Sequence, residues 1–315
     1  MDSESVPDPA VRSRSVDIVV SGSSGFIGTA LCASLAEGGH RVIRLRRGGT
    51  TAGDDIAWDP EAGTIDAGAL EGVDAVVNLA GEGIGERRWS DEQKQRIRES
   101  RVRGTATLAG AIAACSTPPG VLVSGSAVGI YGDRGDEVLT EDSAPGDDFL
   151  AEVCTAWEAE TRPAAEAGVR VVHLRTGIVL GTHGGALQRL LLPFRLGLGG
   201  KQGSGRQWMS WITLADTVAA IRRSIDDATL HGAVNLAAPN PVRNAEFAKT
   251  LGKVLHRPTV LPTPMLPLKI RFGAELVEKL LLVSQRVEPQ RLQAAGFEFA
   301  HPTLEVGLQS LLRAR

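Results

Sequence analysis

Short apolar runs and longer amphipathic segments alternate along most of this 315-residue chain. The short runs are rich in Val and Ile, which is typical of buried strands, while the segments between them carry apolar residues at helical spacing. We predict strands at residues 16–21, 41–46, 73–80, 120–126, 169–175 and 233–237, and helices at 25–38, 91–114, 147–167 and 213–227. This alternation predicts an α/β fold of the Rossmann type, with a doubly wound parallel sheet covered by helices on both faces.

Local signals refine this division of the chain. The tetrapeptide Ser-Asp-Glu-Gln at 90–93 has the order of a capping box and predicts where the second helix starts. Residues 56–65 predict a small hairpin before the third strand. An extended connector is predicted around Pro258, Pro262, Pro264 and Pro267. We therefore divide the chain into a disordered tail (1–15), a Rossmann domain with substrate-side insertions (16–240) and a small C-terminal helical domain (241–315), where Pro289 and Gly296 bound one helix.

Composition removes several classes of function. The net charge of −3 gives no basic field for nucleic acid, so we expect no nucleic-acid partner. The sequence has no apolar stretch of 18 residues and no basic leader, which predicts a cytoplasmic protein without a membrane partner. Cys32, Cys115 and Cys154 form no C-x-x-C motif and the six His residues form no metal-ligand pair. We expect buried thiols instead of disulfides, and no metal.

The strongest chemical signal is a glycine-rich turn between the first strand and the first helix. Residues 16–28 read Val-Asp-Ile-Val-Val-Ser-Gly-Ser-Ser-Gly-Phe-Ile-Gly, and a helical pattern follows. This order is typical of a dinucleotide cradle, in which glycines allow a tight turn, close approach of a pyrophosphate and close packing of the helix. The alternative is a purely structural glycine loop. The predicted cofactor contacts here are Gly22, Ser24, Gly25, Phe26, Ile27 and Gly28.

The ends of the second and third strands indicate which nucleotide binds. Arg46 and Arg47 close the second strand with no acid in reach, which favours the 2′-phosphate of NADP over the ribose hydroxyls of NAD. A solvated basic strand end is the alternative. The third strand ends in Asn-Leu-Ala-Gly-Glu, where small residues allow adenosine to pass, although any strand that ends in a glycine turn looks similar. We predict cofactor contacts at Leu79, Ala80, Gly81 and Glu82.

The glycine motif resembles that of the short-chain dehydrogenase/reductase superfamily, whose usual proton donor is a Tyr with a Lys four residues later. This chain has one tyrosine, Tyr131, and position 135 is glycine, so the usual pair is absent. Further motifs resemble an atypical extended group labelled "epimerase family protein", some members of which carry a SulA-type cell-division inhibitor label. These motifs are Arg-Trp at 88–89, Ser-Arg-Val-x-Gly-Thr at 100–105, Ser-Gly-Ser-Ala-Val-Gly-x-Tyr-Gly at 124–132, the segment 149–158, Leu-Arg-Thr-Gly-Ile-Val-Leu-Gly at 174–181 and Trp-Ile at 211–212. Residues 284–289 and 296–299 resemble the domain of unknown function that ends this group.

The resemblance implies roles for individual positions. Ser126 falls where the superfamily places the serine that hydrogen-bonds the substrate oxygen, whereas Phe149 and Val153 fall where the tyrosine and lysine stand. Arg101 falls where extended members place an asparagine, and the group implies a role for it at the cofactor phosphate. Ser124 and Val153 are further implied cofactor contacts. Because neither a phenyl ring nor valine can transfer a proton, any hydride chemistry needs another proton donor.

Tyr131, Glu82, Glu152 and Asp133 are the candidates for that donor, and we predict Tyr131 with Ser126 as the catalytic residues. The alternative for both is structural, as a buried tyrosine and a serine that satisfies a strand end. Residues 207–211 (Gln-Trp-Met-Ser-Trp) follow a glycine-rich stretch and are expected to roof a substrate pocket, unless they pack in a core.

These observations predict an NADP-binding oxidoreductase, or an enzyme like the nucleoside-diphosphate-sugar epimerases, that lacks the usual Tyr/Lys pair. The alternative is a regulator or sensor that binds NADP(H) without catalysis. The expected partner is an unidentified small molecule, and a homodimer is the candidate oligomer.

Overall fold

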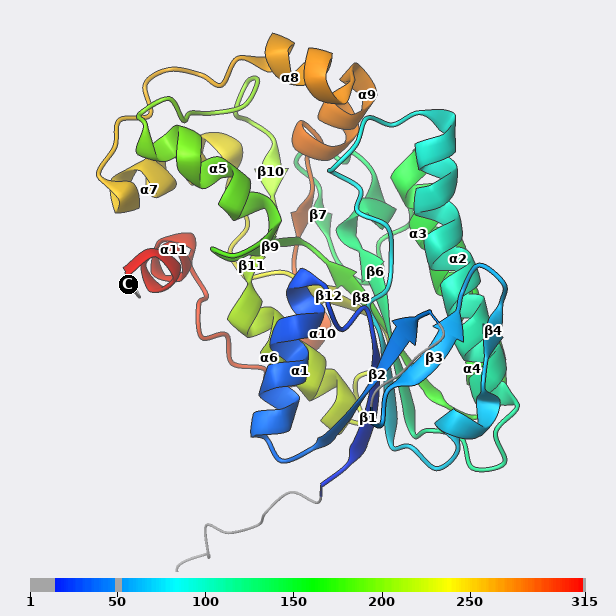
Figure 1. Cartoon of the computed structure of the whole chain (residues 1–315). Helices are drawn as coiled ribbons and strands as arrows, with labels where there is room; N and C mark the ends of the chain where they lie inside the picture. The colour runs from blue at the N-terminus through cyan, green and yellow to red at the C-terminus, as the bar shows by residue number, and fades with distance from the viewer. Residues whose placement is uncertain (1–14, 49–52, 314–315) are drawn as a thin grey trace, which may run out of the picture.

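The computed structural model describes residues 15–48 and 53–313 (Figure 1). Of the predicted tail, residues 1–14 lie outside the described residues. One eight-stranded sheet forms the centre of the fold, in the order β12-β8-β6-β5-β1-β2-β3-β4. All neighbours are parallel except β3 and β4. Its strands are β1 (Asp17–Ser21), β2 (Arg41–Arg47), β3 (Ile56–Asp59), β4 (Thr64–Ile65), β5 (Ala75–Asn78), β6 (Val121–Ala127), β8 (Arg170–Thr176) and β12 (Gly232–Leu236).

This topology confirms the predicted doubly wound sheet. The strand order reverses direction between β1 and β5, where open α/β sheets bind ligands at the carboxyl ends of their strands. The six predicted strands all form, with shifts of one or two residues at their ends. The predicted hairpin at 56–65 forms as β3 and β4, and β3 also extends the large sheet by pairing with β2.

Helices cover both faces of the sheet (Figure 1). One face carries α1 (Phe26–Glu37) and α6 (Leu214–Asp226), and the other carries α2 (Asp91–Ala113), α3 (Phe149–Ala159) and α4 (Arg162–Glu166). The predicted start of α2 is confirmed with Ser90 as N-cap, since its hydroxyl accepts from the amide of Gln93. The reciprocal bond of a capping box does not form, because the Ser90 amide donates to the Arg88 carbonyl and Gln93 Oε1 accepts from Arg96. The prediction of a single helix at 147–167 is wrong, because the helix is interrupted between α3 and α4. Pro163 lacks an amide hydrogen and its ring would clash with a carbonyl one turn earlier in a continuous helix.

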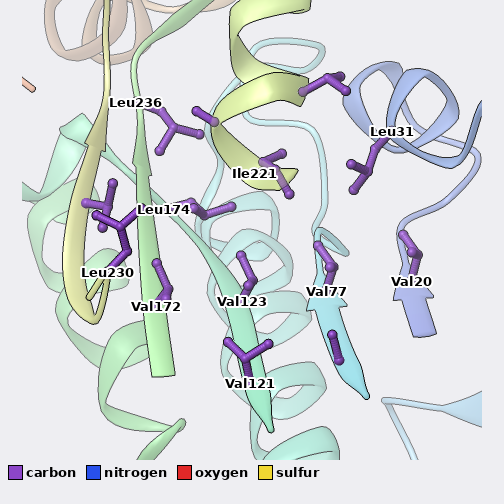
Figure 2. Close-up of a cluster of buried hydrophobic side chains, with 14 of the residues drawn as sticks. Val20, Leu31, Val77, Val121, Val123, Val172, Leu174, Ile221, Leu230 and Leu236 are labelled. Atoms are coloured by element: carbon purple, nitrogen blue, oxygen red, sulfur yellow. The ribbon is translucent and has the colours of Figure 1, made fainter. Parts of the chain in front are cut away.

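The main core lies between the sheet and the α1/α6 layer (Figure 2). Val20, Val77, Val123 and Leu174 project from successive strands toward Ile221 of α6 in this core. On the opposite face, buried residues of α2 pack against the β1 and β5 strands. Because helices cover both faces of the sheet, its strands are apolar on both faces and their polar residues are left at the strand ends.

A second lobe lies beyond the carboxyl ends of the strands, toward the top of Figure 1. Its helices are α5 (Gly185–Arg195), α7 (Asn244–Leu255), α8 (Met265–Phe272), α9 (Ala274–Leu276) and α11 (Leu304–Arg313). Three two-stranded pairs belong to it: β9 (Ile178–Leu180) with β11 (Trp211–Thr213), β10 (Trp208–Met209) with β13 (Val242–Arg243), and β7 (Val138–Leu139) with β14 (Arg286–Val287). The remaining elements are α10 (Gln290–Ala294), η1 (Ala67–Leu70), η2 (Val128–Tyr131) and η3 (Val277–Leu281).

The C-terminal part of the chain is joined to earlier segments by these strand pairs. β13 and β14 each pair with a strand from before residue 240, so the second lobe is assembled from both parts of the chain. The predicted helix between Pro289 and Gly296 forms as α10. The extended connector ends earlier than predicted, because Pro267 lies in the first turn of α8, where an amide hydrogen has no partner within the helix. Within the described ranges, no helix is long and apolar enough to cross a membrane.

Candidate functional site

The glycine turn joins β1 to α1 at the centre of the carboxyl edge. Gly22 adopts a φ of 66°, and a Cβ there would lie 2.6 Å from the carbonyl carbon of Leu79. A Cβ on Gly28 would lie 2.2 Å from the Gly22 oxygen, so this glycine is required for the close packing of helix and strand. A Cβ on Gly25 would instead have one protein neighbour, the Gly22 oxygen at 3.2 Å. Ser24 and Gly25 therefore form the exposed tip of the turn.

The first turn of α1 presents backbone amides without a side-chain acceptor. Gly25 is the N-cap, and no described side chain caps this helix. Uncapped amides and the positive end of the helix dipole together attract an anion. Beside them, the Phe26 ring packs against the loop before α5, where a Cβ on Gly184 would lie 2.4 Å from the ring. Ile27 points the other way and packs against the core.

The end of β2 departs from the prediction in one respect. An acid does lie within reach, because the Asp55 carboxylate accepts from Nε of Arg46 at 2.5 Å. The prediction gave Asp55 no role and treated residues 56–65 as a separate hairpin, but β3 pairs with β2 and brings the preceding Asp55 alongside. Arg47 is exposed and makes no hydrogen bond or ion pair with another described residue. Arg47 is consequently the less engaged of the two predicted phosphate contacts.

A buried network of hydrogen bonds joins the carboxyl ends of β1 and β5 to the helices α2 and α3. Ser21 Oγ donates to Asn78 Oδ1 at 2.6 Å, and Asn78 Nδ2 donates to Thr105 Oγ1 at 2.9 Å. Trp157 Nε1 donates to the same threonine oxygen at 2.8 Å. The amides of Leu79 and Ala80 contact Ser21 Oγ at 3.1 and 3.3 Å. This network fixes the turn after β5 relative to β1 and to the helices α2 and α3.

Arg101 reaches from α2 across the turn that follows β5. A Cβ on Gly81 would lie 3.2 Å from its Cζ, and its guanidinium also lies 5.1 Å from the ring of Trp157. One nitrogen donates to the Ile97 carbonyl of its own helix at 3.0 Å, and no carboxylate within the described ranges forms an ion pair with it. Burial lowers the pKa of Arg101, while Cys154 and Glu82 act in the opposite direction. A half-buried guanidinium of this kind has unused donors for an anionic ligand.

Packed apolar groups fill the positions that correspond to the missing tyrosine and lysine. Val153 is 2 % exposed and belongs to a cluster with Trp89 and Leu276. The half-buried Phe149 ring meets Trp89 edge-on at 5.3 Å, and Nζ of Lys94 lies 5.4 Å from the Phe149 ring. Phe149 and Val153 thus join α3 to α2 and to the C-terminal segment, and the structure gives them a packing role.

Ser126 and Tyr131, the predicted catalytic pair, belong to one buried polar network. Ser126 Oγ donates to Glu158 Oε1 at 2.6 Å, and Arg175 holds that carboxylate through Nε and Nη2 at 2.9 and 3.0 Å. Arg175 Nη1 donates to the Tyr131 hydroxyl at 3.1 Å, and this hydroxyl donates to Asn235 Oδ1 at 2.7 Å. Tyr131 is fully buried, so its proton is already committed inside the fold. The predicted pair is brought together, but its geometry matches the structural alternative.

The charges in this network stabilise one another. Burial raises the pKa of the Glu158 carboxyl, but the Arg175 guanidinium outweighs it and the net pKa is lowered. For Arg175, burial alone would lower the pKa, and the bonds to Glu158 and Tyr131 raise it. Burial also raises the pKa of the Tyr131 phenol. All three shifts keep the network in its present ionic form near neutral pH.

The other predicted proton donors differ in exposure and in their contacts. Glu152 and Asp133 are exposed. Glu82 is half-buried, its amide bonds the Ser100 hydroxyl at 3.0 Å, and its carboxylate accepts from Gln93 at 3.3 Å. Glu82 is therefore the acid candidate that shares a turn with Gly81 and faces Arg101.

The predicted roof at 207–211 divides into two environments. Trp211 is fully buried in the second-lobe core and donates to the Asn240 carbonyl at 3.1 Å, which matches the alternative of core packing. Trp208 is half-buried and lies at the lobe surface. A hollow of about 710 Å³ lies elsewhere, beside α1 and α6, and none of the predicted site residues lines it.

Sequence reasoning gave no role to several residues that the structure brings to this edge. Glu158 and Arg175 were visible within shared motifs, and their opposite charges next to buried strands were the available signal. Ser124 was predicted as a cofactor contact, and its fully buried hydroxyl has no partner within the described part of the chain. Among the thiols, Cys32 and Cys154 are buried as predicted, whereas Cys115 is half-buried. Burial raises the pKa of Cys154 to about 11.

This edge fits a dinucleotide in several respects. Within the described ranges, it combines an open glycine tip, an uncapped helix N-terminus, a half-buried arginine without a carboxylate partner and a serine hydroxyl without a hydrogen-bond partner. Gly25, Arg101 and Arg47 would hold phosphate groups, and Ser124 would face the bound molecule from β6. These features come from four separate elements that meet where the strand order reverses.

Comparisons with known proteins agree with this geometry. The "NAD dependent epimerase/dehydratase family" matches residues 18–237, and a domain of unknown function, DUF1731, matches residues 263–311. The Mycobacterium bovis "Epimerase family protein Mb2239" is 45% identical over 287 residues, which cover 91% of this chain and 94% of that protein.

Two solved structures are also similar to this chain. Human epimerase family protein SDR39U1 (isoform 2), crystallised with NADPH, has a TM-score of 0.86 and 36% identity, covering 95% of this chain and 100% of that one. A nucleoside-diphosphate sugar epimerase from Corynebacterium glutamicum has a TM-score of 0.77 and 39% identity, covering 95% of this chain and 59% of that one. The matched family spans the whole Rossmann part, so the chain belongs to the NAD dependent epimerase/dehydratase family.

Proposed function

We propose that this protein binds NADP(H) and acts as an atypical oxidoreductase or epimerase-like enzyme whose proton donor is not a Tyr/Lys pair. The observation that carries the proposal is Arg101, a half-buried arginine whose guanidinium lies against Gly81 with no carboxylate partner within the described ranges. Such a cation next to the uncapped α1 N-terminus favours an anionic cofactor. The human relative crystallised with NADPH supports the same cofactor.

When bound, NADPH supplies a hydride, and the residues of this chain would orient it and exclude water. The glycine tip and Arg101 would hold phosphates, and Arg47 would favour a 2′-phosphate. Ser126 could hydrogen-bond a substrate oxygen only by weakening its 2.6 Å bond to Glu158. Glu82 is the acid that shares the turn with the Arg101 contact, so it joins Tyr131 as a proton-donor candidate to be tested.

The alternative function is a regulator or sensor that binds NADP(H) without catalysis. The specific observation in its favour is the packed apolar cluster around Phe149 and Val153. The two positions that usually supply the acid and base pack in a core here, and their side chains cannot transfer a proton. In that case NADPH would act by binding two conformations of the protein with different affinities.

Two measurements test the proposal and separate these functions. Calorimetry should detect NADPH binding that is tighter than NADH binding, and absence of NADPH binding would refute both functions. The purified protein should then oxidise NADPH with at least one member of a panel of carbonyl compounds. Glu82→Gln and Tyr131→Phe, each measured for turnover and for NADPH affinity, identify the donor. No turnover with any carbonyl, together with tight NADPH binding, favours the sensor.

A further inference from the structure

Arg286 is a cation that has no counter-charge within the described ranges. It lies on β14, its side chain forms no ion pair or hydrogen bond with another described residue, and its buried Nε has no partner among them. Its neighbours on the strand are fully engaged: Gln285 donates to two backbone carbonyls and Val287 packs in a core. Strand alternation turns Arg286 to the opposite side from these neighbours. An unsatisfied buried donor of this kind calls for a partner that the protein itself does not supply.

The Arg286 side chain lies against the ring of Trp208, which a second arginine also contacts. Its Cζ is 4.8 Å from the indole ring, and Cζ of Arg243 is 4.6 Å from the same ring. Asp136 forms an ion pair with Arg243 at 2.9 Å, and its carboxylate also accepts from Trp208 Nε1 at 3.0 Å. Arg206 lies close enough to help lower the pKa of the Asp136 carboxyl, after the larger effect of the Trp208 hydrogen bond. The group therefore contains three arginines and one carboxylate, and it carries excess positive charge.

This group lies on the same side of the molecule as the cofactor edge. Gln285 Nε2 donates to the carbonyls of Val128 and Gly132 at 2.9 and 3.1 Å, and η2 follows β6 directly after Ser126 and Ala127. The Ser210 hydroxyl donates to the Gln285 carbonyl at 2.7 Å, which ties β14 to the Trp208 segment. Figure 1 shows β7 and β10 in the lobe beyond the carboxyl ends of the sheet strands. β14 is therefore bonded to the segment that directly follows Ser126 at the carboxyl edge of the sheet.

We propose that Arg286, held against Trp208, binds an anionic group of the small-molecule substrate, either a carboxylate or a phosphate. This inference rests on the proposed function, to which it adds the charge of the second ligand. A guanidinium offers a planar pair of donors that matches both kinds of oxyanion. Stacking on the indole holds the guanidinium plane in place before the ligand arrives, which reduces the entropy lost on binding.

The test uses the full-length protein saturated with NADPH, so that the cofactor phosphates do not compete. Inorganic phosphate and malonate are titrated separately at constant ionic strength, and the apparent Kd is taken from the rise in melting temperature. Arg286→Met should weaken binding of at least one of these anions by about 10- to 100-fold, the effect of one charged hydrogen bond. Arg286→Lys should retain part of the affinity. The anion that depends more strongly on Arg286 identifies a phosphate-bearing or a carboxylate-bearing substrate.

Arg98→Met is the matched control, because Arg98 is exposed on α2 and forms no hydrogen bond or ion pair with another described residue. Equal anion affinity in Arg286→Met and Arg98→Met, or no anion binding by the wild type, would overturn the inference. Should Arg286→Met fail to fold, phenylglyoxal labelling of the wild type replaces it. The anion should then slow modification of Arg286 but not of Arg98, and equal rates would refute the site. NADPH affinity, measured on the same samples, separately reports the proposed function.

Discussion

Two glycines of the cradle, three residues apart, should respond to substitution in opposite ways. In Gly28→Ala the new methyl group would lie 2.2 Å from the Gly22 oxygen and 2.9 Å from the Gly22 carbonyl carbon and Ser23 Cα. These are backbone atoms, so they cannot move aside without shifting the strand or the helix. In Gly25→Val the new Cβ meets only the Gly22 oxygen, at 3.2 Å, and the local φ and ψ of −75° and 173° suit a β-branched residue.

The stability change at Gly28 has a diagnostic sign. Replacing glycine by alanine within a helix ordinarily stabilises a protein by roughly 0.5–1 kcal/mol, whereas overpacking costs about 1–3 kcal/mol. Because the obstacle is backbone, we expect the upper part of that cost and a net loss of about 1–2 kcal/mol. The melting temperature should fall by a few degrees, since ~1 kcal/mol shifts a protein of this size by roughly 2–4 °C.

Gly25→Val should leave unfolding close to the wild type, within about 0.5 kcal/mol, because the position is exposed and its conformation is tolerated. Its isopropyl group would occupy the space in front of the uncapped amides of α1. Loss of even one charged hydrogen bond to a phosphate costs about 1.5–3 kcal/mol, so NADPH affinity should fall roughly 10- to 100-fold or more.

Denaturant unfolding and calorimetric NADPH titration of both variants check this pair of predictions. A Gly28→Ala protein as stable as the wild type would show that the turn is loose and that the packing argument fails. A Gly25→Val protein with unchanged NADPH affinity would mean that the nucleotide binds elsewhere, even though the turn has the expected shape.

Three further predictions concern the charges and the phenol. Arg46→Ala/Arg47→Ala should remove a preference for NADPH over NADH of about 2–3 kcal/mol, most of it through Arg47 because Arg46 is paired with Asp55, and calorimetry that shows an unchanged preference would contradict this. Tyr131→Phe should lower the free energy of unfolding by about 1–3 kcal/mol in a urea titration without weakening NADPH, since Asn235 and Arg175 lose a buried partner. The Glu158 carboxyl has its pKa lowered from 4.5, so its stabilising effect is present above that pH and is lost as pH falls through the folded-state value. Glu158→Gln should flatten the acid side of the stability profile, and parallel acid profiles for variant and wild type would be the contrary result.

The large sheet was predictable because its strands are apolar on both faces. Val19 and Val76 face one helical layer while Val20 and Val77 face the other, so the sequence of each strand forms an unbroken apolar run. The glycine turn was also predictable, because close backbone packing in the turn leaves no room for a side chain at Gly22 or Gly28. In contrast, the short strands of the second lobe span two or three residues and leave no periodic signal. Their pairing depends on segments that meet only in the folded chain.

The polar network shows the same limit for the candidate site. Ser126 and Arg175 are register partners on adjacent strands, so their proximity follows from strand pairing that spacing along the chain does not reveal. Glu158 reaches them from α3, and Asp55 reaches Arg46 from the residue just before β3, the strand that the prediction placed in a separate hairpin. Residue types alone predicted which side chains are chemically capable. What each side chain does depends on its hydrogen-bond and ion-pair partners, which only the folded structure brings together.

The phenol and the serine that remain in this chain belong to one hydrogen-bonded network at the carboxyl edge of the sheet. Tyr131 donates to Asn235 of β12, Arg175 reaches it from β8, and the same guanidinium fixes the Glu158 carboxylate that accepts from Ser126. A ligand oxygen that accepted the hydrogen bond of Ser126 would remove one hydrogen bond from Glu158 but leave both bonds from Arg175. The cost would therefore be about one net hydrogen bond, roughly 0.5–1.5 kcal/mol, which a substrate or cofactor contact can offset. Loss of the Tyr131 proton would break the bond to Asn235 and leave a buried phenolate facing an amide oxygen, so it would cost more even though Arg175 would still donate to it. A ligand at this edge would therefore disturb the network less through Ser126 than through Tyr131.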